Sequence, residues 1–327
     1  PGAATTAQVE GLTLTPQATG TFAGPDVEYT TLPGEGETTA NTSGFSYLFD
    51  VERSGEKVER QYTVDWKLED LRGRIAAGTE PHLRVHALTP CDEVALASGQ
   101  PPQNKSGNPK SLRYLIQSRL GTEVNSQFVS VIEPYEKAPF IRSVRRLKVE
   151  HQADQDSVAA VAIDLVDGRT DIVIGCEEPT AVTVEGGIEF DGTYALVRLV
   201  GGQVVTMRMA GGTLLQVGEF SLSTSAAAYT GTVKAVDVSD PADNRVLLEP
   251  PLPPDAALVG EVIHFQNAQP EDTSYDIKAI DGDSISTGDI TLIAGFKDQK
   301  DFGAGYTFLV NVGDRYVVPT KAGLDRQ

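Results

Sequence analysis

Apolar and polar residues alternate along most of this chain with a period of two, which is the period of a β-strand and not of a helix. Clear alternating or apolar runs occupy residues 45–51, 62–66, 83–88, 127–133 and 141–149. The fourth run is followed by Pro134, where we expect the strand to end. In the fifth run, apolar positions alternate with arginine and lysine. The pattern predicts a chain built almost wholly of strands.

Glycine-containing dipeptides separate short β-rich runs at regular intervals between residues 157 and 220. They are Asp167-Gly168, Gly186-Gly187, Asp191-Gly192, Gly201-Gly202 and Gly211-Gly212. Such pairs supply the positive φ that tight hairpin turns require. Residues 158–165 have enough alanine for a helix, but their β-branched content and the Asp-Gly that follows favour a buried strand. The spacing predicts an antiparallel meander, as in a sandwich or barrel.

Changes in composition divide the chain into three parts. Residues 1–33 are rich in Thr, Gly and Pro and are predicted to be an extended arm that packs on something else. Residues 34–220 carry the predicted large sandwich. The small residues of 221–228 indicate a linker, after which strands resume at 231–237, 261–265 and 275–280, so 221–327 is predicted to be a smaller β domain. The expected fold is therefore all-β: a large antiparallel β-sandwich, a smaller β domain and an extended N-terminal arm.

Composition excludes several classes of function. The 327 residues are 40% hydrophobic and 22% charged, which is typical of a globular protein. The net charge is 27 − 46 = −19, which opposes binding to nucleic acid, because that depends on Lys and Arg at phosphates. No apolar run reaches the ~20 residues of a membrane span, and no signal-peptide pattern opens the chain. We therefore expect a mature form or an internal fragment.

Two cysteines and two sequons bear on the cellular compartment. Cys91 and Cys176 either form one disulfide or remain two buried thiols, and the sequence leaves both open. Asn41 and Asn104 begin N-x-S/T triplets in loop-like stretches, which matter only if a glycosylating cell secretes the protein. An acidic, Thr-rich and Cys-poor chain favours a secreted, extracellular protein.

Residues of catalytic or metal-binding type form no recognisable motif. His82 and His86 are four apart on a predicted strand, so they share a face, with Arg84 between them. A third ligand is missing nearby and the arginine opposes a cation, so we interpret them as structural or surface histidines and predict no metal and no cofactor. The sequence lacks a Gly-x-Ser-x-Gly elbow and a P-loop. Asp281-Gly282-Asp283 is better explained as a hairpin turn than as a calcium loop.

One aromatic pair and one basic strand are candidate carbohydrate contacts. Tyr62 and Trp66 lie at i, i+4 on a predicted strand and therefore face one side, where two rings can stack on a sugar. The alternative is that both are core residues of a sandwich. Arg142 and Arg145 belong to the basic strand that would supply further contacts.

Two stretches of the chain resemble a recurrent part of the β-sandwich region of heparinase II/III-like polysaccharide lyases. They are residues 114–121 (YLIQSRLG) and residues 126–144 (SQFVSVIEPYEKAPFIRSV). The core phrase is a strand that ends in Glu-Pro-Tyr, followed by Pro-Phe-Ile and a second strand. Residues 47–55 and 167–174 are similar to further parts of that region, and 229–295 to a terminal β domain of some members. The resemblance covers about residues 28–320.

The resemblance implies the fold of this chain more than it implies a catalytic activity. In that family an N-terminal (α/α) toroid carries most of the catalytic machinery, and no such segment is present here. The family's β region often adds a histidine in a His-Asp-Tyr-like phrase, but residues 58–65 contain none and only Tyr62 matches. We therefore assign no catalytic residue. Glu133 and Arg119 are expected to form a structural ion pair, and Glu133-Pro134-Tyr135 a turn at a sheet edge.

Three functions follow as hypotheses. The first is a non-catalytic extracellular module that binds or supports polysaccharide. The second is a structural subunit that assembles with copies of itself, as a filament or oligomer, through the arm and its sheet edges. The third is the C-terminal portion of an active polysaccharide lyase, whose catalytic domain would precede this segment.

Overall fold

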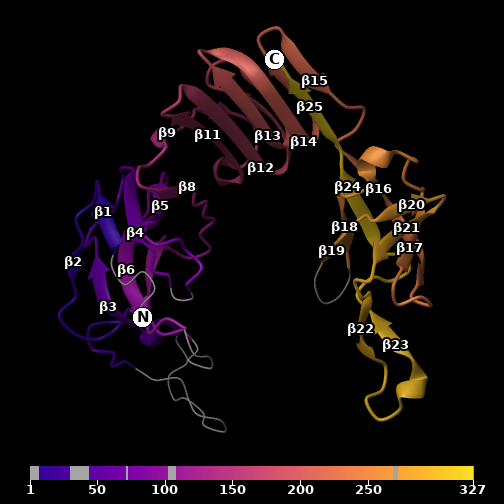
Figure 1. Ribbon diagram of the computed structural model, residues 1–327, viewed down its shortest axis with the longest axis horizontal. Coiled ribbons are helices and arrows are strands. Elements are labelled where there is room, and N and C mark those ends of the chain that lie inside the picture. Colours follow the sequence, from indigo (N-terminus) through magenta and orange to yellow (C-terminus); the bar gives the residue numbers. More distant parts are fainter. Residues whose placement is uncertain (1–6, 30–43, 71–72, 102–107, 268–271, 327) are drawn as a thin grey trace. The chain divides into compact units, whose positions relative to one another are not determined.

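The computed structural model describes residues 7–29, 44–70, 73–101, 108–267 and 272–326, and Figure 1 shows their arrangement. Helical structure in these ranges is limited to four short 3-10 turns: η1 (Gly44–Tyr47), η2 (Gln155–Ser157), η3 (Ala256–Leu258) and η4 (Phe302–Ala304). All other regular elements there are strands. The predicted all-β class is confirmed.

The chain forms two compact units. Unit 1 contains residues 1–147 and 154–172, and unit 2 contains residues 148–153 and 173–327. The chain passes between the units after residues 147 and 153, and it passes into unit 2 for the last time inside strand β12 (Arg169–Val184). This division differs from the predicted boundary at 220/221, because a continuous strand carries no glycine- or proline-rich break that a sequence reading would detect.

Two antiparallel sheets of four strands build most of unit 1. The first has the order β1 (Ala7–Glu10), β4 (Tyr62–Lys67), β5 (Pro81–Ala87), β8 (Ser130–Glu136). The second has the order β2 (Thr15–Pro16), β3 (Leu48–Arg53), β6 (Glu93–Gly99), β7 (Leu112–Ser118). A hairpin of β9 (Ile141–Arg146) and β11 (Val158–Leu165) follows, so residues 158–165 form a strand as predicted.

The core of unit 1 lies between the two four-stranded sheets. Tyr62, Val64 and Trp66 on β4 pack in one cluster with Val94 and Leu96 on β6. Their spacing of two along each strand places them on the inner faces, as alternation requires. Burial of this apolar surface is what joins the two sheets into a sandwich.

The N-terminal segment is part of this sandwich. β1 pairs with β4, with Ala7 opposite Trp66 and Glu10 opposite Thr63, and β2 pairs with β3. The residues described in the predicted arm thus complete both sheets of their own unit.

Unit 2 contains long strands followed by a smaller domain. Its first sheet has the order β12, β13 (Ile188–Val200), β14 (Gln203–Val217), β15 (Phe220–Ser223), and β10 (Val149–Glu150) pairs with β12. The last strand, β25 (Lys321–Asp325), also pairs with β14. The second sheet has the order β19 (Thr273–Asp276), β18 (Val262–Gln266), β24 (Arg315–Pro319), β16 (Ala228–Asp237), β17 (Asn244–Glu249), β21 (Ser284–Gly288), β20 (Ala279–Asp281).

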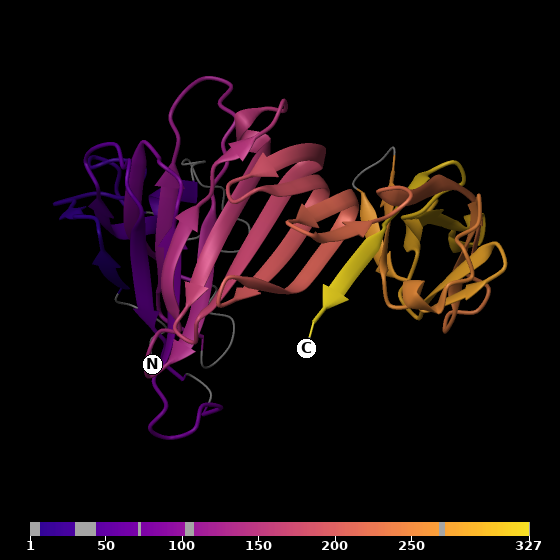
Figure 2. The same ribbon diagram turned by 90° about the horizontal axis from the view of Figure 1, so that it is seen from above.

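The seven-stranded sheet has a core of its own, and Figure 2 shows its strands curving around a common centre. Phe265, Tyr316 and Ile263 are among its fully buried side chains. Gly282 and Asp283 form the turn between β20 and β21, which confirms the predicted hairpin. A separate two-stranded sheet, β22 (Ile293–Phe296) with β23 (Tyr306–Phe308), extends from this domain (Figure 1).

The prediction that Pro134 ends its strand is wrong. Pro134 lies inside β8 opposite Leu83, and β8 is the last strand of its sheet, where a missing N–H is tolerated.

The structure also bears on the cysteines, the sequons and the expected absence of a membrane span. Cys91 and Cys176 are both free thiols, and Cys91 is fully buried. Asn41 and Asn104 lie outside the described residues. Over the described ranges, no helix has the length and apolar character needed to cross a membrane.

Candidate functional site

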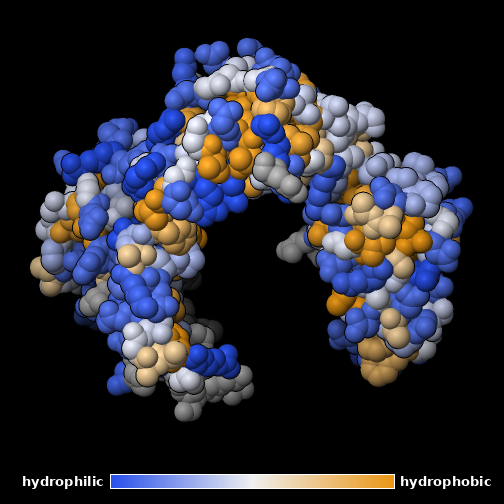
Figure 3. All heavy atoms as spheres, turned by 45° about the horizontal axis from the view of Figure 1, so that its top comes forward, coloured by the Kyte–Doolittle hydropathy of each residue, from blue (hydrophilic) through white to orange (hydrophobic). Residues whose placement is uncertain are grey.

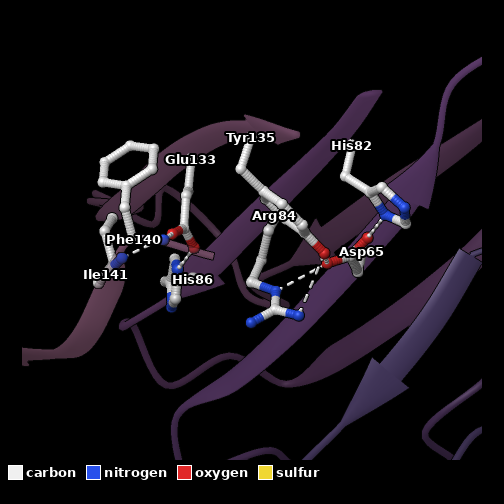
Figure 4. A network of polar contacts seen from close by, with 8 residues as sticks. All are labelled: Asp65, His82, Arg84, His86, Glu133, Tyr135, Phe140 and Ile141. Carbon is white, nitrogen blue, oxygen red and sulfur yellow. Dashed lines mark hydrogen bonds and ion pairs between the residues drawn. The ribbon is translucent and has the colours of Figure 1, made fainter. Parts of the chain in front are cut away.

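The outer face of the β1–β4–β5–β8 sheet is lined by polar side chains (Figure 4). Alternation turns Tyr62, Val64 and Trp66 inward and therefore turns Thr63 and Asp65 outward. The antiparallel register places Arg84 of β5 opposite both Asp65 of β4 and Glu133 of β8. Side chains from three strands thus meet on one surface, which we call the polar face: Thr63, Asp65, His82, Arg84, His86, Glu133 and Tyr135.

Asp65 is the centre of one group on the polar face. Its Oδ1 accepts a hydrogen bond from Nδ1 of His82 at 2.7 Å. Its Oδ2 accepts from Nε of Arg84 at 2.8 Å and from the hydroxyl of Tyr135 at 2.5 Å. The rings of His82 and Tyr135 stack with centroids 4.8 Å apart and planes 15° from parallel. One carboxylate therefore fixes the positions of three side chains.

These contacts shift the protonation equilibria of the group. Burial disfavours the ionised form of Asp65, but the hydrogen bonds from Tyr135, His82 and Arg84 outweigh it, so the pKa of Asp65 is lowered. Burial, and then the hydrogen bond to Asp65, raise the pKa of Tyr135 to about 12. At neutral pH Asp65 is consequently an anion that accepts all three hydrogen bonds, and Tyr135 is a neutral donor.

Glu133 is the centre of the second group and is fully buried. Its Oε1 accepts from the backbone N–H groups of Phe140 and Ile141, each at 2.7 Å. Its Oε2 lies 2.9 Å from Nε2 of His86. When Nε2 of His86 carries the ring proton, it donates to this oxygen. The other ring nitrogen, Nδ1, makes no hydrogen bond to any described residue.

A small cavity adjoins the polar face at His86. It has a volume of about 190 Å³, and its lining includes the polar residues Glu10, Gln61, Thr63 and His86, with Val144 of β9. The hydroxyl of Thr63 is buried and has no hydrogen-bond partner within the described part of the chain. A buried hydroxyl without a partner is uncommon, so Thr63 retains unused hydrogen-bonding capacity at the lining of this cavity.

Two further groups on the polar face have unused hydrogen-bonding capacity. Nε2 of His82 and Nη1 of Arg84 have no hydrogen-bond partner among the described residues, although the other nitrogens of both side chains are bonded. Both side chains are partly exposed to solvent. The polar face therefore presents a guanidinium donor and an imidazole nitrogen whose orientations are set by Asp65, an arrangement suited to a ligand rich in hydroxyl groups, which both donate and accept hydrogen bonds.

The predicted aromatic platform is corrected by the structure. Tyr62 and Trp66 do share a face, but it is the inner one: their side chains are 3% and 7% exposed and belong to the sandwich core. The core alternative describes them correctly, because a ring packed between two sheets has no free face for a sugar.

Arg142 and Arg145 are exposed on β9 but do not join the polar face. On that strand it is Val144, between them in sequence, that lines the cavity. The expected ion pair between Glu133 and Arg119 is also wrong. β8 pairs with β5, whereas Arg119 follows β7 in the other sheet, and Glu133 is bonded to His86 instead.

The sequence identified part of the polar face. Strand spacing correctly placed His82, Arg84 and His86 together. It missed Asp65 and Glu133, because their pairing with β5 joins residues 19 and 47 positions apart in the chain. Throughout the described ranges, no three His, Cys, Asp or Glu residues are arranged to hold a metal ion.

Comparisons with protein-family models, with curated proteins and with solved structures found no match to this chain. The resemblance to heparinase II/III-like lyases remains a prediction from residues 114–144 and the similar stretches around them. Any assignment of function therefore depends on the geometry of the polar face and its cavity.

Proposed function

We propose that this chain is a non-catalytic β-sandwich module that binds polysaccharide through the polar face of unit 1. The observation that supports this most is the cavity beside His86, which is lined by polar residues that include Thr63, whose buried hydroxyl has no hydrogen-bond partner in the described part of the chain. A sugar hydroxyl both donates and accepts hydrogen bonds and so satisfies such a group.

The chemistry of the polar face agrees with a hydroxyl-rich ligand. Asp65 forms an ion pair with Arg84, so the charge of the guanidinium on this surface is balanced by the carboxylate that holds it. The free nitrogens of His82 and Arg84 belong to fixed side chains, so little rotamer entropy is lost when a ligand binds. The buried carboxylates hold these side chains in place, and the partly exposed nitrogens would contact the ligand.

The self-assembly alternative has less support. It required an arm that pairs with another copy, but β1 and β2 pair with strands of their own unit. For the lyase alternative, the polar face contains histidines, but nothing places a sugar C5 proton beside them.

The test compares two threonine-to-valine variants of the full chain on a polysaccharide array, with hits measured by calorimetry. Thr63→Val removes the unpaired hydroxyl without breaking a hydrogen bond to the described part of the chain, so it is expected to keep the fold and weaken binding at least fivefold. Thr21→Val is the matched control, because Thr21 has a buried, unpaired hydroxyl elsewhere in unit 1.

Two results would contradict the proposal. If the wild-type chain binds no polysaccharide, or if both variants bind like the wild type, the polar face is not a glycan site. If the chain alone cleaves an acidic polysaccharide and produces unsaturated-uronide absorbance, the module is catalytic and the lyase alternative replaces it.

A further inference from the structure

Three aromatic side chains gather in solvent on the β22–β23 hairpin of unit 2. Phe296, Phe302 and Tyr306 are 45%, 65% and 41% exposed. The ring of Phe296 lies with its centroid 4.5 Å from that of Phe302 and 5.4 Å from that of Tyr306. In Figure 3 a hydrophobic patch appears at the end of the molecule where this hairpin projects, with hydrophilic surface around it. We call the three residues the aromatic tip.

The aromatic tip does not contribute to the core of its domain. The hairpin is anchored at its base by Leu292 and Val310, which are fully buried in the core of the seven-stranded sheet. β22 and β23 pair only with each other in the described chain. Beyond that base, the three rings pack against one another and not against the core. Exposed large apolar groups that cluster in this way mark an interaction surface more often than single exposed residues do.

Backbone hydrogen bonds hold the turn between the strands in a defined shape. Oδ1 of Asp298 accepts from the N–H of Lys300 at 2.8 Å, and Oδ1 of Asp301 accepts from the N–H of Gly303 at 2.9 Å. The N–H of Lys297 donates to the carbonyl of Gly305 at 2.9 Å. Phe302 opens the short turn η4 that Asp301 caps. The tip is therefore organised before any ligand arrives.

The charges beside the rings indicate which ligand fits. Asp298 and Asp301 each use one carboxylate oxygen to fix the turn. Lys297 and Lys300 are exposed, and their ammonium groups pair with no carboxylate of the described residues. Two cationic donors thus remain available next to three rings, in a protein whose net charge is −19. A ligand with apolar faces and negative groups complements both features.

We propose that the aromatic tip binds an acidic polysaccharide, with sugar C–H faces packed on the rings and carboxylate or sulfate groups paired with Lys297 and Lys300. The negative face of an aromatic ring attracts polarised C–H groups. A lipid bilayer fits less well, because residues 296–306 contain no aliphatic side chain larger than that of Ala304 to enter the hydrocarbon region. The choice of a glycan rests on the function proposed above, whereas the location rests on residues of unit 2 alone.

The experiment measures binding of the full chain to polygalacturonate, with dextran as a neutral polysaccharide and phosphatidylcholine–phosphatidylserine vesicles as a membrane probe. Phe302→Ala removes the most exposed ring and is expected to weaken polygalacturonate binding five- to tenfold. The double variant K297E/K300E is expected to weaken it similarly and to reduce its dependence on salt. Phe128→Ala, at an exposed phenylalanine of unit 1, is the matched control and should bind like the wild type.

The outcomes separate this inference from the proposed function. If polygalacturonate binding is lost in Thr63→Val but unchanged in Phe302→Ala and in K297E/K300E, the tip is not a glycan site while the polar face is. If the tip variants alone lose binding, the tip is confirmed and the polar face is excluded. If the wild type binds vesicles through Phe302 and no polysaccharide, both assignments are overturned.

Discussion

Asp65 on β4 and Arg84 on β5 lie directly opposite each other, and Nε of Arg84 donates to Oδ2 of Asp65 at 2.8 Å. The same carboxylate accepts from His82 and Tyr135, so three side chains from β5 and β8 depend on one ionised group of β4. This relationship connects the stability of the sandwich to the presentation of its polar face, because the donors offered to a ligand are held by Asp65.

We expect Asp65→Asn to destabilise unit 1. The amide has no negative charge and one acceptor oxygen, so Arg84 loses its ion pair and one of the remaining donors loses its partner. Loss of hydrogen bonds to a charged group in a mostly buried position should lower the free energy of unfolding by about 2–3 kcal/mol. Urea unfolding at pH 7 measures this. Asp167→Asn is the control, because that carboxylate is exposed in its pair with Arg169 and its loss should leave the midpoint unchanged.

The lowered pKa of Asp65 predicts how stability depends on pH. A carboxyl whose folded pKa lies below its unfolded value of about 3.9 stabilises the fold above that pH. The contribution is lost as pH falls from the unfolded pKa through the folded pKa, because over that range the unfolded state binds a proton more readily than the folded state. The stability difference between the wild type and Asp65→Asn should therefore be largest at neutral pH and shrink below pH ~4. A difference that stays constant down to pH ~3 would show that Asp65 is not the titrating group.

Substitutions at Glu133 test how much its buried carboxyl group contributes to the stability of unit 1. In Glu133→Leu the N–H groups of Phe140 and Ile141 and the ring of His86 lose their acceptor, so the free energy of unfolding should fall by about 3–5 kcal/mol. Glu133→Gln keeps one carbonyl oxygen for the two backbone donors and should cost clearly less. Thermal unfolding followed by circular dichroism compares the two. Equal losses would mean that size, and not hydrogen bonding, determines the effect at this position.

A substitution at Trp66 tests whether this side chain belongs to the core of unit 1 or to a sugar-stacking surface. Trp66→Ala leaves a cavity between the sheets of unit 1 and should lower the free energy of unfolding by about 3–5 kcal/mol. Tyr114→Ala is a matched aromatic truncation on β7 at an exposed ring and should have little effect. Chemical unfolding monitored by circular dichroism measures both. A Trp66→Ala variant with wild-type stability and lost glycan binding would restore the stacking interpretation.

Periodicity predicted much of the local structure in this chain, but the Asp191-Gly192 and Gly211-Gly212 pairs lie inside β13 and β14 and do not separate strands as expected. Alternation predicted the strands near 62–66 and 83–88, and the Asp167-Gly168 pair separates two strands as expected. It also placed His82, Arg84 and His86 on one side. It failed at Pro134, where the missing N–H does not end the strand because β8 is at the edge of its sheet. The sequence contains no signal of which strand is an edge.

The sequence by itself determined the all-β class, the alternation of each strand and which neighbours along a strand share a face, since these follow from backbone geometry within a few residues. Only the tertiary structure decided which face of β4 is buried, so only it could place Tyr62 and Trp66 in the core. It also decided that Asp65 and Glu133 meet β5, and that Phe296, Phe302 and Tyr306 stay in solvent. The physical reason is that burial and cross-strand register depend on hydrogen bonds and packing between segments far apart in the chain, and no local pattern encodes their pairing.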